Sequence, residues 1–240
     1  MNIRPHIILN GVDSSTVEGL IITELPPITK PPIRTLIDVI DGRDGDIVTE
    51  LGYSAYDRVV KIGLTYNYNL DKIIDYFNGN GWVIFSNEPD RYYLYGIYNQ
   101  IDFERLIRFK TAEITLHVQP FKYPVTEIPI TETNLGQTTD IAVYNSGNIY
   151  SRPKITITAS GDVVLSINGF DVLSIEFGET AQTIIIDCDK MNAYSLDNVL
   201  LNRLVTGNYD KIKLEKGNNS LYVEGGGIAE ITIEKYTRWI

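Results

Sequence analysis

The residues that could carry out chemistry in this chain are few and scattered. His6 is predicted to lie in an amino-terminal arm and His117 on the polar face of a strand. They form no His-x-His or His-x-x-x-His pair, so each is interpreted as a solvated or hydrogen-bonded surface residue. The single cysteine, Cys188, excludes an internal disulfide and a thiolate metal cluster, and its apolar run predicts a half-buried strand thiol. Nucleophile elbows, dinucleotide fingerprints and P-loop lysine motifs are all missing from the sequence. The sequence therefore predicts a protein that is not an enzyme and that uses no cofactor or metal.

The acidic run from Asp41 to Asp46 is the sharpest local feature, and three interpretations stay open. A calcium loop of the EF-hand type would need glycine at its sixth position and glutamate at its twelfth, where this chain has Asp46 and Gly52. The run could instead be a tight loop in which Arg43 reaches an acidic neighbour, because the fork of a guanidinium suits a carboxylate. The default interpretation is a solvated hairpin tip.

Two further chemical interpretations are weak. Gly225-Gly226-Gly227 could be a phosphate cradle, but it lies between two predicted strands rather than before a helix, which favours a hairpin turn. A pair of carboxylates could hydrolyse a cell-wall glycan, but among 31 acidic residues some pairs look suitable by chance. Hydrolysis is kept as the least favoured function.

The net charge and the hydropathy of the chain limit the classes of partner that it can bind. The 240 residues have a net charge of -10 and a pI of about 4.7, so the chain lacks the basic excess that nucleic acids and anionic membranes attract. We expect neither sequence-specific nucleic-acid binding nor membrane insertion. The segment from Met1 to His6 is not typical of a signal peptide, and no window approaches the roughly 18 apolar residues of a membrane span. We therefore expect synthesis in a cytoplasm.

The elements that must position these residues are mostly strands. Apolar residues alternate with others over residues 60–67 and 112–118, which indicates strands with one buried face. The other predicted strands are residues 20–24, 34–40, 82–85, 92–98, 141–144, 154–158, 163–168, 172–177, 183–188, 221–224 and 230–235. In the second half, turn residues recur every 8 to 12 residues or so, the spacing expected of a β-sandwich.

One segment predicts a helix. Leu70, Ile73, Ile74 and Phe77 have helical spacing, and Asn69 before them is a suitable N-cap. A second stretch, residues 196–204, has apolar residues that fit either a helix or a buried strand.

Two segments divide the chain. Prolines 26, 27, 31 and 32 predict an extended connector at a sheet edge or in an arm, since proline cannot join a central ladder. Residues 131–140 are polar with little apolar content, which is typical of a linker. The predicted domains are residues 1–133 and 134–240.

A series of ordered landmarks runs through the chain. The first half carries Asn10-Gly11-Val12-Asp13-Ser14, Asp41-Gly42-Arg43-Asp44-Gly45, the single helix, and Phe121-Lys122-Tyr123-Pro124. The second half carries Val143-Tyr144-Asn145-Ser146-Gly147, Ser151-Arg152-Pro153-Lys154-Ile155, Ile184-Ile185-Ile186-Asp187, and a turn from Leu214 to Leu221. Each motif alone is weak, but their order and spacing and the total length resemble the distal tail proteins of siphophages, which form the hub ring at the tail tip.

The resemblance implies a mainly β fold: a belt-like amino-terminal domain with one α-helix, followed by a galectin-like β-sandwich. It implies a virion tail-tip protein that forms a homohexameric ring and contacts the tail tube protein, a tail-tip protein and the tape measure protein, with DNA passing through its lumen. Because ring closure can pair exposed sheet edges, we place the interface on the proline-bracketed arm and on a hairpin predicted from Arg34 to Leu51. The candidate residues are Arg34, Ile37, Arg43, Asp44, Asp46 and Val48.

The alternative function is a carbohydrate-binding module for host cell-surface glycans. It would use aromatic side chains of the second half that stack on sugars, although core or interface roles are favoured for them. These candidates are Tyr144, Tyr150, Tyr194, Tyr222 and Trp239. The second domain also has no room for the carbohydrate-binding insertions of longer relatives.

Overall fold

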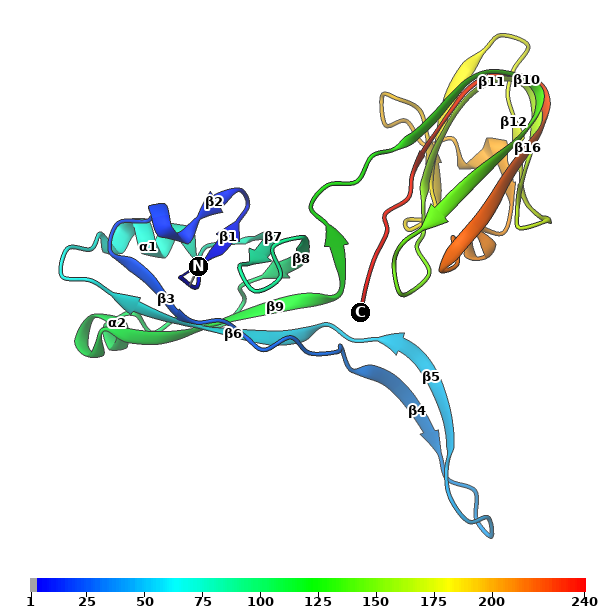
Figure 1. The fold of residues 1–240 in the computed structure, drawn as a ribbon. Coiled ribbons are helices and arrows are strands. Elements are labelled where there is room, and N and C mark those ends of the chain that lie inside the picture. Colours follow the sequence, from blue (N-terminus) through cyan, green and yellow to red (C-terminus); the bar gives the residue numbers. More distant parts are fainter. Residues whose placement is uncertain (1–3) are drawn as a thin grey trace. The chain divides into compact units, whose positions relative to one another are not determined.

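The computed structural model describes residues 4–240 as two units of mainly β structure (Figure 1). The first unit extends to Val125 and includes Ile240, and the second is Thr126–Trp239. The first three residues of the predicted amino-terminal arm lie outside the described residues. His6 does not belong to a free arm, because its backbone exchanges hydrogen bonds of 3.0 Å with Ser86 and leads directly into the first strand.

A seven-stranded sheet forms the body of the first unit, in the order β2-β1-β7-β8-β9-β6-β3. Its strands are β1 (Ile7–Leu9), β2 (Val12–Asp13), β3 (Leu20–Glu24), β6 (Tyr56–Leu64), β7 (Asn80–Phe85), β8 (Arg91–Gly96) and β9 (Thr111–Pro124). Alternate residues of β6 and β9 are buried, as the period of two predicts. Two short helices add the fully buried Ile73 and Leu106 to this core.

The predicted helix is confirmed as α1 (Leu70–Tyr76), capped by the Asn69 side chain, which accepts a 3.2 Å hydrogen bond from the Lys72 amide. The prediction of a single helix is wrong, because a second one, α2 (Phe103–Phe109), precedes β9. Asp102 caps α2 by accepting a hydrogen bond from the Arg105 amide at 2.8 Å. α2 has the same length as α1, so its Asp102 cap and the helical spacing of Phe103, Leu106 and Ile107 were a signal that sequence reasoning missed.

Three long strands organise the second unit: β10 (Ile130–Asn145), β11 (Lys154–Ile167) and β16 (Gly217–Glu234). They lie side by side in the order β10-β16-β11 and curve together (Figure 1). One half of β11 pairs with β13 (Gln182–Asp187) and the other half with β12 (Phe170–Glu176). The shorter β14 (Asn192–Tyr194) and β15 (Val205–Gly207) extend these two ends of the sheet.

Bulges bend the long strands from one layer to the other. The register shifts near Gly136 in β10, between Ser160 and Val163 in β11, and opposite them in β16 at Gly225 to Gly227. A Cβ atom at Gly226 would lie 1.6 Å from the Ser160 carbonyl oxygen, so only glycine fits this close approach. Because strands can change sheets through bulges, one folded sheet encloses an apolar core between its halves.

Several sequence predictions for the second unit are wrong for this reason. The triple glycine is a bulge inside β16 rather than a turn, so the predicted strands at 221–224 and 230–235 are one strand. The predicted strands at 154–158 and 163–168 likewise form β11. The predicted linker at 131–140 lies within β10, and the two units meet at residue 125 rather than 133. Most of the residues in this stretch are exposed, although the strand pairs with β16.

Two smaller differences concern residues after β13. The 196–204 stretch forms neither a helix nor a long strand. It is a loop in which the Ser195 amide donates a 2.9 Å hydrogen bond to the Val199 carbonyl, and a 3-10 turn follows at Asn202–Leu204. Cys188 is fully buried rather than half-buried, and burial raises the pKa of its thiol. The thiol is therefore a packing group.

Candidate functional site

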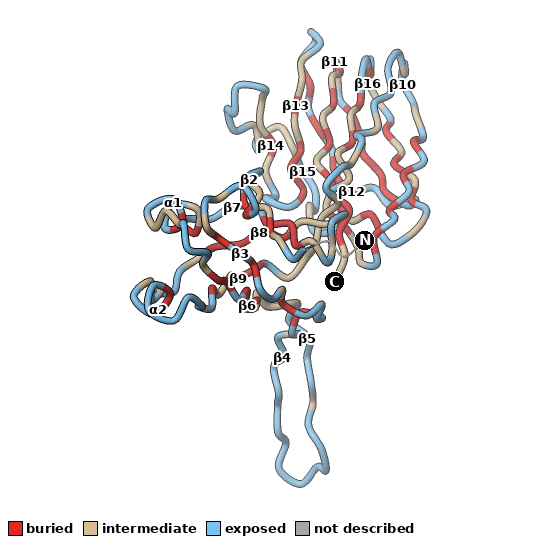
Figure 2. The backbone as a smooth tube through the Cα atoms, turned by 60° about the vertical axis from the view of Figure 1, so that its left-hand side comes forward, coloured by how far each residue is buried: buried red, intermediate tan, exposed pale blue. Residues whose placement is uncertain are grey.

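The most exposed regular element of the first unit is a separate hairpin formed by β4 (Ile33–Asp38) and β5 (Ile47–Tyr53). It leaves the body of the unit as a two-stranded ribbon, and its full length is exposed (Figure 2). Among the described residues, no other strand pairs with it. A two-stranded ribbon is marginally stable in water, so this one needs a further surface to cover it.

Both faces of the hairpin carry apolar side chains. Ile37 lies opposite Val48 on one face, and these side chains are 55% and 57% exposed. The other face carries Leu36, which is 50% exposed, and Ile47. Exposed apolar side chains gathered in one element mark a contact surface rather than a solvated ribbon.

The hairpin tip is acidic and held by a tight turn. Asp41, Asp44 and Asp46 are exposed there, and the Arg43 amide donates a 3.1 Å hydrogen bond to the Ile40 carbonyl. Within residues 4–240, no group of three His, Cys, Asp or Glu side chains is placed to hold a metal ion. The tip is thus a charged end on an apolar ribbon.

The predicted interface residues all belong to this hairpin. Arg34 and Ile37 lie in β4, Val48 lies in β5, and Arg43, Asp44 and Asp46 occupy the tip between them. Each of these six side chains is exposed. The structure brings them together on one element, and their role in a ring interface stays a prediction.

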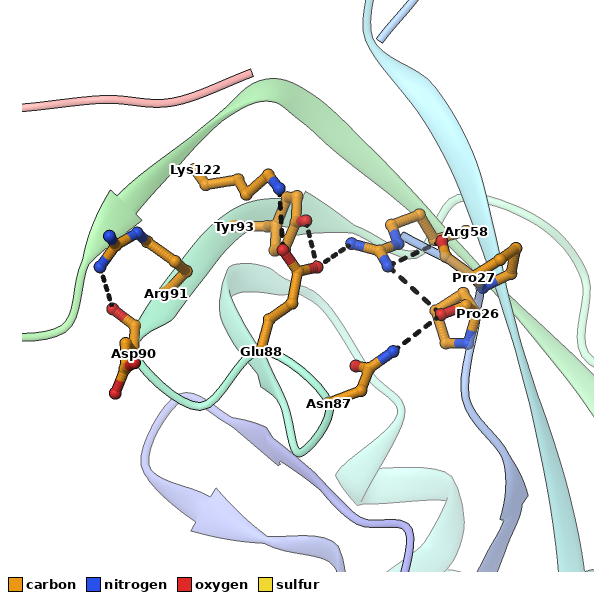
Figure 3. Close-up of polar contacts among 9 residues, drawn as sticks. All are labelled: Pro26, Pro27, Arg58, Asn87, Glu88, Asp90, Arg91, Tyr93 and Lys122. Atoms are coloured by element: carbon orange, nitrogen blue, oxygen red, sulfur yellow. Dashed lines mark hydrogen bonds and ion pairs between the residues drawn. The ribbon is translucent and has the colours of Figure 1, made fainter. Parts of the chain in front are cut away.

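A buried arginine fixes the root of the hairpin (Figure 3). Arg58, on β6 just after the hairpin, is 2% exposed, and its guanidinium lies over the rings of Phe85 and Tyr93, 4.4 and 4.6 Å from their centroids. Its guanidinium donates hydrogen bonds to the carbonyl oxygens of Pro26 (3.4 Å) and Pro27 (3.1 Å), on the segment that leads into β4. One side chain therefore connects the strand that leaves the hairpin with the segment that enters it.

Glu88 neutralises this arginine. Its carboxylate accepts hydrogen bonds from Arg58 (3.2 Å), from the Tyr93 hydroxyl (2.6 Å) and from Lys122 (2.8 Å). Burial raises the pKa of the Glu88 carboxyl, but the hydrogen bonds and charge of these three partners outweigh it and hold the pKa below its usual value. Asn87 adds a 3.1 Å hydrogen bond to the Pro26 carbonyl.

Sequence reasoning missed this cluster, although one signal was present. Tyr56, Arg58, Val60 and Ile62 share the buried phase of β6, so a charged residue occupies a core position. A buried charge requires partners, and the alternation alone could have indicated that Arg58 has them.

The remaining candidates for chemistry are dispersed. His117 Nδ1 lies 2.7 Å from Asp57 Oδ1 on the exposed face of the first sheet, and His6 lies 4.0 Å from Asp13. In the second unit Lys213 and Arg238 lie 4.9 and 4.6 Å from the Tyr150 ring centroid, so this ring already contacts two cations.

None of the helices in residues 4–240 has the length and apolar character needed to cross a membrane.

The two-unit, mainly β fold is shared with a phage hub protein of known structure. No protein-family model matches the chain, and no curated protein matches it. Among solved structures it is similar to the Dit protein of phage SPP1, with a TM-score of 0.68 and 16% identity over 95% of this chain and 97% of that chain. A chain of the phage P2 baseplate in its activated conformation gives a TM-score of 0.46 and 12% identity, over 96% and 97%. The comparison with the SPP1 protein shows a shared fold. It therefore confirms the predicted fold class, and it confirms the resemblance as a resemblance in fold.

Proposed function

We propose that this chain is a structural hub protein of a phage tail tip, which assembles into a hexameric ring and performs no catalysis. In that role it would join the tail tube protein to the tail-tip or receptor-binding proteins, beside the tape measure protein. The SPP1 relative in fold is described as a paradigm of the hub adsorption apparatus in phages that infect Gram-positive hosts. The shared fold over nearly all of both chains supports the same role here.

The observation that carries the proposal is the hairpin with apolar residues on both faces. An isolated chain would leave Leu36, Ile37 and Val48 half exposed to water, at a cost of about 25 cal/mol for each Å² of apolar surface. Self-association would cover them, and the buried Arg58 cluster holds the hairpin root in place for such a contact. A module that only binds sugars would not need this hairpin.

The charge of the chain is compatible with a lumen that DNA crosses. At -10 the protein would repel the phosphate backbone within a Debye length of about 10 Å at 0.1 M salt. Acidic side chains on the lumen wall would therefore prevent DNA from adhering. Neutralising the acids that a ring structure places on the lumen should slow ejection, and an unchanged ejection rate would contradict this part.

The test weakens the hairpin surface without unfolding the chain. In the double variant Ile37→Thr/Val48→Thr both residues stay β-branched, so strand propensity is kept while the apolar surface is reduced. The matched control is Leu196→Thr/Val199→Thr, which changes two side chains exposed by 68% and 59% in the second unit. Light scattering should show that the hairpin variant loses assembly and the control keeps it; equal assembly by both variants would overturn the proposal.

A further inference from the structure

The α2 segment, residues 102–110, carries three cations and two acids, Asp102 and Glu104, whereas the whole chain has a net charge of -10. Arg105, Ile107, Arg108, Phe109 and Lys110 are all exposed and form what we term the α2 patch. Phe109 is 63% exposed and Ile107 is 38% exposed, and the Arg108 guanidinium lies 5.7 Å from the Phe109 ring centroid. Three cations and two apolar side chains therefore share one short segment.

The α2 patch is rigidly placed. Leu106 is fully buried in the core of the first unit, and the Asp102 cap fixes the first turn of α2. Lys110 ends the helix in a left-handed conformation at φ 59°, and its ammonium lies 4.5 Å from the Tyr68 ring centroid. A preorganised surface loses little conformational entropy on binding.

The β4–β5 hairpin has the complementary composition. Between residues 34 and 51 it carries five acids and two arginines, together with the exposed apolar side chains described above. The acids are Asp38, Asp41, Asp44, Asp46 and Glu50. An acidic apolar ribbon and a basic apolar patch can bury their apolar groups while their charges pair, which gives register and specificity.

The two surfaces lie at opposite ends of the same strand (Figure 1). The hairpin runs into β6 at Tyr56, whereas α2 leads into β9 at Thr111, which pairs with Gly63 near the far end of β6. At about 3.3 Å per residue these ends are separated by roughly 25 Å, and the hairpin extends away from α2. They therefore cannot meet within one chain, but they can meet between two.

We propose that the β4–β5 hairpin of one copy docks on the α2 patch of the next copy. This inference rests on the proposed ring and names both halves of its interface. The contact is heterologous, because different surfaces of the two copies meet, and such contacts close into a ring when the rotation between copies permits. Asp44 and Asp46 at the tip face Arg105 and Arg108 of the neighbouring copy.

A charge-reversal experiment tests the pairing in the full-length protein. One variant is Asp44→Arg/Asp46→Arg and the other is Arg105→Glu/Arg108→Glu; all four side chains are exposed, so both variants should fold. Each variant alone should assemble at least tenfold more weakly than the unmodified chain, by sedimentation velocity. The matched controls make the same charge changes in the second unit: Glu179→Arg/Asp197→Arg and Lys211→Glu/Lys216→Glu.

An equimolar mixture of the two reversal variants gives the decisive readout. When the two variants alternate, the basic tip of one variant meets the acidic patch of the other, and the unmodified acidic tip meets the unmodified basic patch. Alternating copies should therefore restore assembly and close an even-numbered ring. A mixture that stays as weak as its components, or an α2 variant that assembles normally, overturns the pairing. If the pairing is overturned but the unmodified chain assembles, the proposed hub function still stands. A monomeric unmodified chain contradicts both the pairing and the hub function.

Discussion

The β4–β5 hairpin and the long strands of the second unit carry similar apolar residues but bury them to opposite extents. In β11, Ile155 and Ile157 are fully buried, because the folded sheet supplies a second apolar layer. In the hairpin, Ile37 and Val48 are more than half exposed, since the described chain supplies no layer above either face. The same strand pattern indicates a core where a second layer exists and an interface where it does not.

The largest effect is expected inside the second unit. Replacing Ile157 by alanine should destabilise that unit by about 3 to 4 kcal/mol, because it leaves a cavity in a close-packed core. The exposed control Leu196→Ala should cost less than about 0.5 kcal/mol. Urea unfolding measures both, and assembly of the folded Ile157→Ala protein should be unchanged. Lost assembly at full folding would place the second unit in the interface and break the comparison.

A smaller effect is expected at the hairpin root. Arg58→Met should destabilise the first unit by about 3 kcal/mol, because it removes a buried partner of Glu88 and the donors to the Pro26 and Pro27 carbonyls. Hydrogen exchange should become faster in residues 25–53, whereas Arg203→Met, which changes an exposed arginine of the second unit, should leave exchange there unchanged. Unchanged exchange in the Arg58 variant would show that the hairpin root is held by other contacts.

Low pH should destabilise the root of the β4–β5 hairpin. The folded state holds the pKa of Glu88 below the ordinary value of 4.5, so ionised Glu88 contributes stability above that pH. That contribution is lost as the pH falls through the lower, folded-state pKa. The protection of residues 25–53 against hydrogen exchange, relative to the intrinsic exchange rate at each pH, should therefore decrease as the pH falls below 4.5, and Glu88→Gln should flatten this dependence. Glu176→Gln, an exposed control in the second unit, should keep the dependence of the unmodified chain.

The smallest effect on folding is expected on the second face of the hairpin. Leu36→Thr should change the free energy of unfolding by less than about 0.5 kcal/mol, since Leu36 is half exposed already. It should nevertheless weaken assembly if partners cover both faces, as the placement of Leu36 and Ile47 indicates. Phe170→Thr, which alters a 71% exposed side chain of the second unit, is the control. Normal assembly of Leu36→Thr would restrict the interface to the face of Ile37 and Val48.

Local patterns were sufficient to predict much of this fold. The alternation in β6 and β9 predicted their buried faces, and the Asn69 cap and apolar spacing predicted α1. The four prolines predicted an extended connector, and residues 25–32 are an irregular segment that leads into β4. Each of these signals depends on neighbouring residues along the chain, where sequence spacing reports directly on geometry.

The errors arose where distant residues decide the structure. The glycines at 225–227 form a bulge only because Ser160 of the adjacent β11 approaches their backbone. The polar residues at 131–140 are a strand because β16 pairs with them. Arg58 is buried because Glu88 and two proline carbonyls lie beside it. None of these partners is close in sequence.

The central claim is self-association of this chain into a closed ring. The most direct test is its absolute mass in solution, by size-exclusion chromatography with light scattering over a range of concentrations. We predict a species of six times the 27.1 kDa monomer mass. A mass of one chain at every concentration would contradict the account.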